Sequence, residues 1–162
     1  ISGMLADART VFDFAGEWLS ARSYRPTIIV MGRSLGSASA LEIAAAYPTK
    51  TAGLIIDSGF ADVMGLLARL GAPRSTRIAA DTMIRQEDKM ASYHGPTLII
   101  HGTDDLIIPV ADADALFHAC PSPVKRLLKI EQAGHNNLMA VGMKAYLQAV
   151  ADLVRSVHGR EE

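Results

Sequence analysis

Apolar residues along the chain recur with two different periods, one typical of helices and one typical of buried strands. A helical period opens the chain, where one face carries Met4, Leu5, Ala8, Val11, Phe12, Ala15, Trp18 and Leu19. Another helical stripe closes the chain and comprises Leu138, Val141, Ala145, Ala149, Leu153 and Val157. We expect both stripes, Trp18 included, to face the core.

Four short runs between these helices predict strands, at residues 27–31, 53–57, 97–101 and 125–130. The run at 27–31 is apolar and rich in β-branched residues, which is typical of a strand buried on both faces. Helices are predicted from about 35 to 47 and near 111–119. Residues 60–94 are expected to form a short helical excursion between the second and third strands, with helices near 62–70 and 78–93.

This alternation predicts right-handed βαβ units around a parallel sheet with helices on both faces, an α/β three-layer sandwich. The length of 162 residues suits one domain spanning 1–162. In such sheets the reactive side chains lie at the carboxyl ends of the strands. The segments to search for chemistry are therefore 32–36, 57–60, 101–109 and 131–138.

Composition narrows the possible partners. The net charge is −1 and the isoelectric point is about 6.6, so no broad positive field favours nucleic acid. No apolar run approaches the ~18 residues of a membrane span. One cysteine, Cys120, cannot form an internal disulfide, and the cytoplasm is the default expectation. No ligand spacing predicts a metal, and Gly32–Gly36 lacks the G-x-G-x-x-G spacing of dinucleotide sites, so no cofactor is expected.

The segment Gly32-Arg33-Ser34-Leu35-Gly36 has the form G-x-S-x-G and lies between a predicted strand and a predicted helix. Such a turn lifts a serine hydroxyl above the sheet on strained backbone. The glycines on either side are expected to remove Cβ atoms that would collide with neighbouring chain. The sequence therefore predicts that Ser34 is a nucleophile, against the alternative of an ordinary glycine-rich loop.

A serine nucleophile needs a base in contact with it and a carboxylate that orients the base. The segment 101–109, which contains Asp104 and Asp105, supplies the acid, and the segment after the fourth strand supplies His135 as the base. From the residues alone, Asp105, its neighbour Asp104 and Asp57, at the end of the second strand, are all open as the acid. His101 is interpreted as a group that organises its loop rather than as a ligand.

Arg33, beside the candidate nucleophile, has two interpretations. Its guanidinium could bind acidic groups of a substrate, or it could form an ion pair within the protein. The sequence does not choose between them.

Three motifs together resemble the α/β-hydrolase superfamily: Gly-Arg-Ser-Leu-Gly, the His-Gly-x-x-Asp-x-Ile-x-Pro loop that begins at His101, and Gly-His-Asn around His135. The nearest resemblance is to the Bem46-like and "α/β-hydrolase domain-containing" serine hydrolases. It implies that Asp105 is the acid and His135 the base. It also implies that the Leu35 backbone N–H contributes to an oxyanion hole.

The chain departs from that family in one respect, because the resemblance implies about four further strands before the first helix. The chain is therefore expected to be the C-terminal part of an α/β-hydrolase fold, with the second oxyanion donor in the missing part. Losing one such donor costs about 100- to 1000-fold in rate. The strand at 27–31 would also have an unpaired apolar edge, so we expect a homo-oligomer or pairing with the missing segment.

The function expected from these residues is a serine hydrolase that cleaves a carboxylic ester or related acyl bond of a small molecule through an acyl-serine intermediate. Thioesters and amides use the same groups and stay open. The alternative is a non-catalytic binding or assembly module on the same scaffold, because a fold does not by itself determine function.

Overall fold

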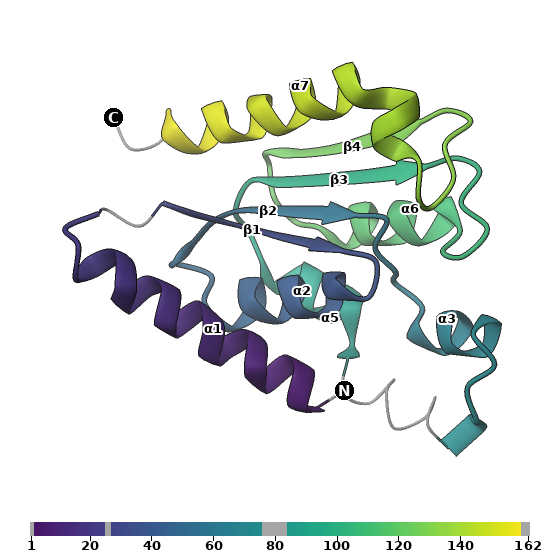
Figure 1. The fold of residues 1–162 in the computed structure, drawn as a ribbon, viewed down its shortest axis with the longest axis horizontal. Coiled ribbons are helices and arrows are strands. Elements are labelled where there is room, and N and C mark those ends of the chain that lie inside the picture. Colours follow the sequence, from purple (N-terminus) through teal and green to yellow (C-terminus); the bar gives the residue numbers. More distant parts are fainter. Residues whose placement is uncertain (1, 25–26, 76–83, 160–162) are drawn as a thin grey trace.

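The computed structural model of the chain describes residues 2–24, 27–75 and 84–159 (Figure 1). One parallel sheet contains the strands in the order β1 (Ile28–Arg33), β2 (Thr51–Asp57), β3 (Thr97–Gly102) and β4 (Lys125–Ile130). The described helices are α1 (Ser2–Ser20), α2 (Gly36–Ala46), α3 (Val63–Arg69), α5 (Gln86–Ser92), α6 (Val110–Ala119) and α7 (Leu138–His158). The predicted α/β sandwich with a parallel sheet is confirmed.

Strand order and handedness decide which helix covers which face. The chain steps in one direction from β1 to β4, so right-handed crossovers put the connecting helices on one face. Helices α2 and α6 pack there, with α5 against both of them and α1 against α2. Helix α7, which follows the last strand, returns across the opposite face (Figure 1).

Successive side chains of the inner strands enter two different cores. Leu54 and Ile56 of β2 join Ile99 of β3 in the core beneath α2, α5 and α6. Ile55 of β2 and Ile100 of β3 point the other way, into the core beneath α7. Because neighbouring residues of a strand face opposite sides, covering both faces requires an unbroken apolar run.

The two outer strands of the sheet have different chemistry. β4 carries Lys125, Arg126 and Lys129, and such charges discourage pairing with another chain. β1 pairs with β2 only, and the side chain of its Met31 is 50% exposed. Within the described residues β1 therefore has the unpaired edge that the sequence predicted. Pairing of this edge with another chain or segment stays a prediction.

The stripe predicted on the first helix is only partly buried. Leu5 and Phe12 are each 8% exposed and belong to the interior, as expected. Trp18 is 43% exposed and Val11 is 66% exposed, so their assignment to the core is wrong. Helix α1 packs on α2 rather than on the sheet, and one helix neighbour covers a narrower stripe than a sheet does.

The stripe predicted on the last helix is confirmed at Leu138, Ala149, Leu153 and Val157 and is wrong at Val141 and Ala145. Val141 is 47% exposed and Ala145 is also exposed, whereas Tyr146 is buried with Ala149 beneath the helix. The cause is Gly142, which has non-helical dihedral angles of −123° and 26° and shifts the register of the apolar face. A Cβ atom at position 142 would lie 2.6 Å from the Ile130 side chain, so glycine permits this close approach.

The excursion between β2 and β3 contains α3 and α5 in its described part. The helix predicted near 78–93 is wrong in its start, because Arg85 has a left-handed φ angle of 40° and the observed helix runs from Gln86 to Ser92. Residues 78–83 lie outside the described residues. No helix in the described part of the chain is long and apolar enough to cross a membrane.

Buried Glu42 joins three helices. Its carboxylate, on α2, accepts hydrogen bonds from Arg9 of α1 (Nε to Oε1, 2.7 Å) and pairs with Lys89 of α5 (Nζ to Oε2, 2.7 Å). Burial alone would raise the pKa of Glu42, but the hydrogen bonds and charges of Lys89 and Arg9 outweigh it and lower that pKa below 4.5.

We expect Glu42→Gln to lower the free energy of unfolding by ~2 kcal/mol at pH 7, because hydrogen bonds to a charged group are lost in the interior. A folded-state pKa below the unfolded value means that the carboxylate stabilises the fold above the unfolded pKa. That stabilisation disappears as the pH falls through the folded-state pKa. Urea unfolding of both proteins from pH 7 to pH 3 tests this. Asp152→Asn, in an exposed ion-pair cluster, is the control and should change stability little.

The turn between β1 and α2 needs glycine at one of its two glycine positions. A Cβ atom at Gly32 would lie 2.5 Å from the Gly36 carbonyl oxygen and 2.6 Å from the Ala40 Cβ. A Cβ atom at Gly36 would meet no described atom within 4 Å. The expectation that both glycines avoid collisions therefore holds for Gly32 and is wrong for Gly36.

We expect Gly32→Ala to destabilise the fold by about 3 kcal/mol, because helix α2 must move away from β1. Gly36→Ala should leave stability unchanged or slightly higher, since alanine favours helix. Thermal unfolding of both variants measures the difference. Equal melting temperatures would contradict this account of the turn.

Candidate active site

The candidate nucleophile Ser34 lies at the sharp turn that joins β1 to α2. Its φ angle is 51°, in the left-handed region that side-chain-bearing residues seldom adopt. The Ser34 N–H donates to the Asp57 carbonyl (2.9 Å), and the Ser37 N–H donates to the Ser34 carbonyl (3.0 Å). These two bonds hold the strained residue in place and do not use the Leu35 N–H.

The structure brings Ser34, His135 and Asp105 together in one chain of hydrogen bonds. His135 Nδ1 lies 2.7 Å from Asp105 Oδ2, and His135 Nε2 lies 2.9 Å from Ser34 Oγ. A carboxylate only accepts, so Nδ1–H donates to Asp105. Nε2 is then left as the acceptor for the Ser34 hydroxyl. This arrangement can remove the hydroxyl proton when the oxygen attacks an electrophile.

Asp105 is held by its own loop as well as by His135. Its Oδ1 accepts the backbone N–H groups of Ile107 and Ile108, each at 2.9 Å, and its side chain is fully buried. His101, also fully buried, has Nε2 2.8 Å from the Ile108 carbonyl and 3.5 Å from Asp105 Oδ2. His101 therefore organises the loop around the carboxylate, in agreement with its interpretation from the sequence.

The two other carboxylates that the sequence left open are placed differently. Asp104 is exposed and accepts a hydrogen bond from the Thr103 hydroxyl (3.1 Å). Asp57 is buried and accepts hydroxyl hydrogen bonds from Ser58 (3.0 Å) and Tyr146 (2.8 Å). His135 Nδ1 makes its hydrogen bond to Asp105 Oδ2. Geometry thus favours Asp105 as the partner of His135.

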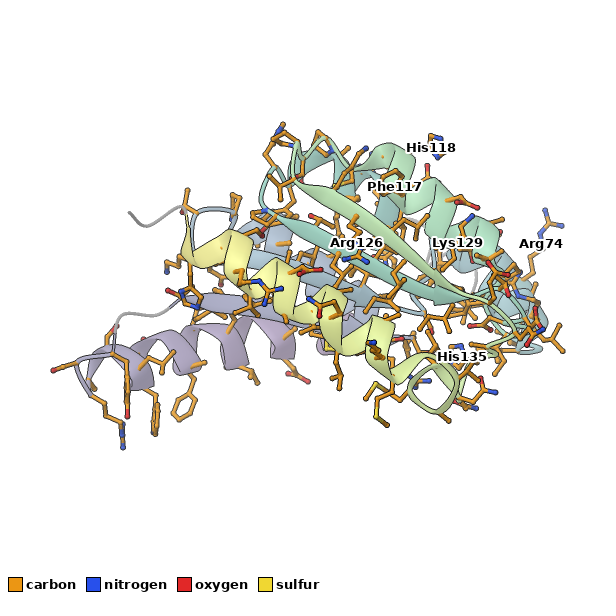
Figure 2. The ribbon with its side chains drawn as sticks, turned by 90° about the horizontal axis from the view of Figure 1, so that it is seen from above. Arg74, Phe117, His118, Arg126, Lys129 and His135 are labelled. Atoms are coloured by element: carbon orange, nitrogen blue, oxygen red, sulfur yellow. The ribbon has the colours of Figure 1, made fainter. Side chains whose placement is uncertain are left out.

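Figure 2 labels His135 in the loop that leads into α7. The Arg33 guanidinium donates through Nη2 to the backbone carbonyl of His135 and to Asn136 Oδ1 (3.3 Å). Its Nε lies 3.8 Å from Asp57 Oδ1. Of the two interpretations of Arg33, the structure supports contacts within the protein.

Tyr146 is the residue near the site that the sequence interpretation missed. Burial, followed by the hydrogen bond and charge of Asp57, raises the pKa of Tyr146 far above its usual value, so its hydroxyl stays a donor. The only sequence signal was its helical spacing with Ala149, Leu153 and Val157. The kink at Gly142 interrupts the helical period before Tyr146, so the spacing counted from Leu138 did not predict that Tyr146 is buried.

Leu35, whose N–H was expected to bind an oxyanion, is the N-cap of α2 and is 47% exposed. Its amide lies at the helix end that favours negative charge. Among the described residues, no group of three or more His, Cys, Asp or Glu side chains could hold a metal ion.

Comparison with known proteins shows what the chain as a whole is similar to. No protein-family model matches the chain. Human alpha/beta hydrolase domain-containing protein 17B is 31% identical over 157 residues, which cover 94% of this chain and 51% of that protein. The chain thus spans about half the length of the curated relatives it matches.

Solved structures show the same fold. Est1E from Butyrivibrio proteoclasticus matches with a TM-score of 0.75 and 21% identity, covering 93% of this chain and 69% of that one. A monoacylglycerol lipase from Paleococcus ferrophilus matches with a TM-score of 0.68 and 16% identity, covering 95% and 75%. The fold, the relatives and the order of the motifs agree: the chain belongs to the α/β-hydrolase superfamily.

Proposed function

We propose that this chain carries the catalytic groups of a serine hydrolase that cleaves a carboxylic ester or a related acyl bond. The observation that carries the proposal is the continuous hydrogen-bond chain from Ser34 through His135 to buried Asp105. A hydroxyl, an imidazole and a carboxylate in this order form the arrangement that activates a serine for acyl transfer. The similarity in fold to a solved esterase domain from Rhodothermus marinus and to the monoacylglycerol lipase adds support.

In the proposed reaction, Ser34 Oγ attacks the carbonyl carbon of the substrate while its proton passes to His135 Nε2. The resulting oxyanion accepts a hydrogen bond from the Leu35 N–H. Collapse of the tetrahedral intermediate breaks the bond to the leaving alcohol, which takes the proton from Nε2. Water then attacks the acyl-serine with His135 again as the base, and the acid and Ser34 are released.

Asp105, the amides that bind it and the backbone at Ser34 each have a defined task in this scheme. Asp105 keeps the Nδ1 proton in place and stabilises the imidazolium that forms during each proton transfer. The two N–H groups that bind Asp105 Oδ1 keep its carboxylate aimed at His135. The left-handed conformation of Ser34 directs Oγ away from the sheet and towards the base.

We expect a fluorophosphonate probe to add once to the parent chain and not to Ser34→Ala or His135→Ala, as measured by intact mass.

Asp105→Asn should lower ester turnover by about 10⁴-fold, because the imidazole loses the partner that fixes its tautomer. Asp104→Asn is the matched control, since it makes the same change at the exposed neighbouring residue, and it should keep the parental rate.

Ester turnover that survives in Ser34→Ala would remove Ser34 from the mechanism. Equal losses in Asp104→Asn and Asp105→Asn would contradict the assigned acid. If neither the folded chain nor a longer form that adds the expected upstream strands labels or hydrolyses esters, a binding or assembly module is favoured instead.

A further inference from the structure

Arg33 joins the strand of the candidate nucleophile to the loop of the candidate base. It directly precedes Ser34 at the end of β1, and its Nη2 donates to the backbone carbonyl of His135 and to Asn136 Oδ1. The hydrogen bonds to Asp105 and Ser34 hold only the His135 imidazole. Arg33 is thus the described side chain that holds the His135 backbone.

The guanidinium is in turn backed by a buried anion. Asp57, whose side chain is 5% exposed, lies 3.8 Å from Arg33 Nε and accepts the Tyr146 hydroxyl. Tyr146 belongs to α7, the helix that begins just after the His135 loop. Arg33 and Asp57 therefore connect the ends of β1 and β2 with both the His135 loop and α7.

Guanidinium geometry suits this double contact. The Nε and Nη2 groups point along two arms of a planar fork, so one side chain can bind Asp57 and the His135 carbonyl together. A lysine ammonium has one charged centre and reaches one partner well. Asn137 does not substitute for this restraint, because its Oδ1 accepts from the Gly134 N–H within the same loop (2.7 Å).

We propose that Arg33 is a positioning residue, which holds the His135 backbone against the nucleophile turn, with Asp57 as its counter-ion, so that His135 Nε2 stays in reach of Ser34 Oγ. The inference rests on the proposed function for its catalytic consequence. A misplacement of about 1 Å between base and nucleophile costs on the order of 100-fold in rate. The partly exposed Arg33 side chain acts through the backbone of the base.

The test compares Arg33→Met and Arg33→Lys with Arg126→Met as a matched control. Arg126 has a similar side-chain exposure (48% against 44%) and also pairs with an aspartate, Asp152. It lies on β4, four residues and ~13 Å before the carboxyl end of that strand, away from the His135 loop (Figure 2). Melting temperatures of all three variants show whether they fold.

The first measurement is kinetic. We expect Arg33→Met to lower kcat and the fluorophosphonate labelling rate about 10- to 100-fold with little change in KM, and Arg33→Lys to recover part of the loss. Arg126→Met should keep parental rates. A neutral and an anionic ester are compared, because binding of an acidic substrate group would instead raise KM for the anionic ester alone.

The second measurement does not depend on activity. The His135 Nδ1 proton, held by Asp105, should give a downfield proton NMR signal in the parent and in Arg126→Met, assigned by its loss in His135→Ala. We expect this signal to broaden or vanish in Arg33→Met and to persist in part in Arg33→Lys.

Parental rates and an unchanged signal in folded Arg33→Met would overturn the positioning role, as would a rise in KM for the anionic ester alone. If Arg33→Met does not fold, Arg33→Lys decides by the same two readouts. A signal that depends on Arg33 in a parent chain that never labels would leave the positioning of His135 standing while the proposed function fails.

Discussion

The structure depends on one constraint, which is that both faces of β2 and β3 must be covered by apolar side chains. Their residues alternate between two cores, so helices must pack on each side of the sheet. With both faces occupied, the surfaces left for polar chemistry near the sheet are its strand ends. The loops after β1, β3 and β4 meet at the carboxyl edge, and there Ser34, Asp105 and His135 come into contact.

Contact among these three side chains requires each loop to be rigid. The turn at Ser34 is held by bonds to Asp57 and Ser37. The loop after β3 folds around the Asp105 carboxylate, with His101 behind it. Rigid support of this kind matters because proton transfer from Ser34 to His135 depends on distances near 3 Å.

A second buried carboxylate lies beside the triad and faces a different set of partners. Asp57 accepts hydrogen bonds from Tyr146 and Ser58 and lies near the Arg33 guanidinium. Asp105 instead accepts a hydrogen bond from the His135 imidazole. The two anions at neighbouring strand ends thus have separate cations or donors. This separation explains how a site with several acidic residues can direct one imidazole to one carboxylate.

Much of this organisation could be predicted from the sequence, because it depends on local patterns. Apolar runs and helical periods located the strands and helices, and their ends agree with those observed to within one or two residues except for the helix predicted near 78–93, which begins at Gln86. The motif around Ser34 and the loops at Asp105 and His135 named the residues that meet at the sheet edge. Parallel topology explains that success, since the carboxyl ends of parallel strands share one edge.

Tertiary structure decided what depends on contacts between distant segments. Exposure of Trp18, the outward position of Val141 and the freedom at Gly36 follow from packing partners that no local pattern specifies. Strand positions by themselves left Asp57, Asp104 and Asp105 open as the acid, because all three lie at or near strand ends, and it was the resemblance to α/β-hydrolases that favoured Asp105. The sequence by itself determined which residues reach the carboxyl edge. The folded chain decided which carboxylate His135 bonds and which carbonyl Arg33 holds, because hydrogen bonds need positions accurate to a few tenths of an ångström.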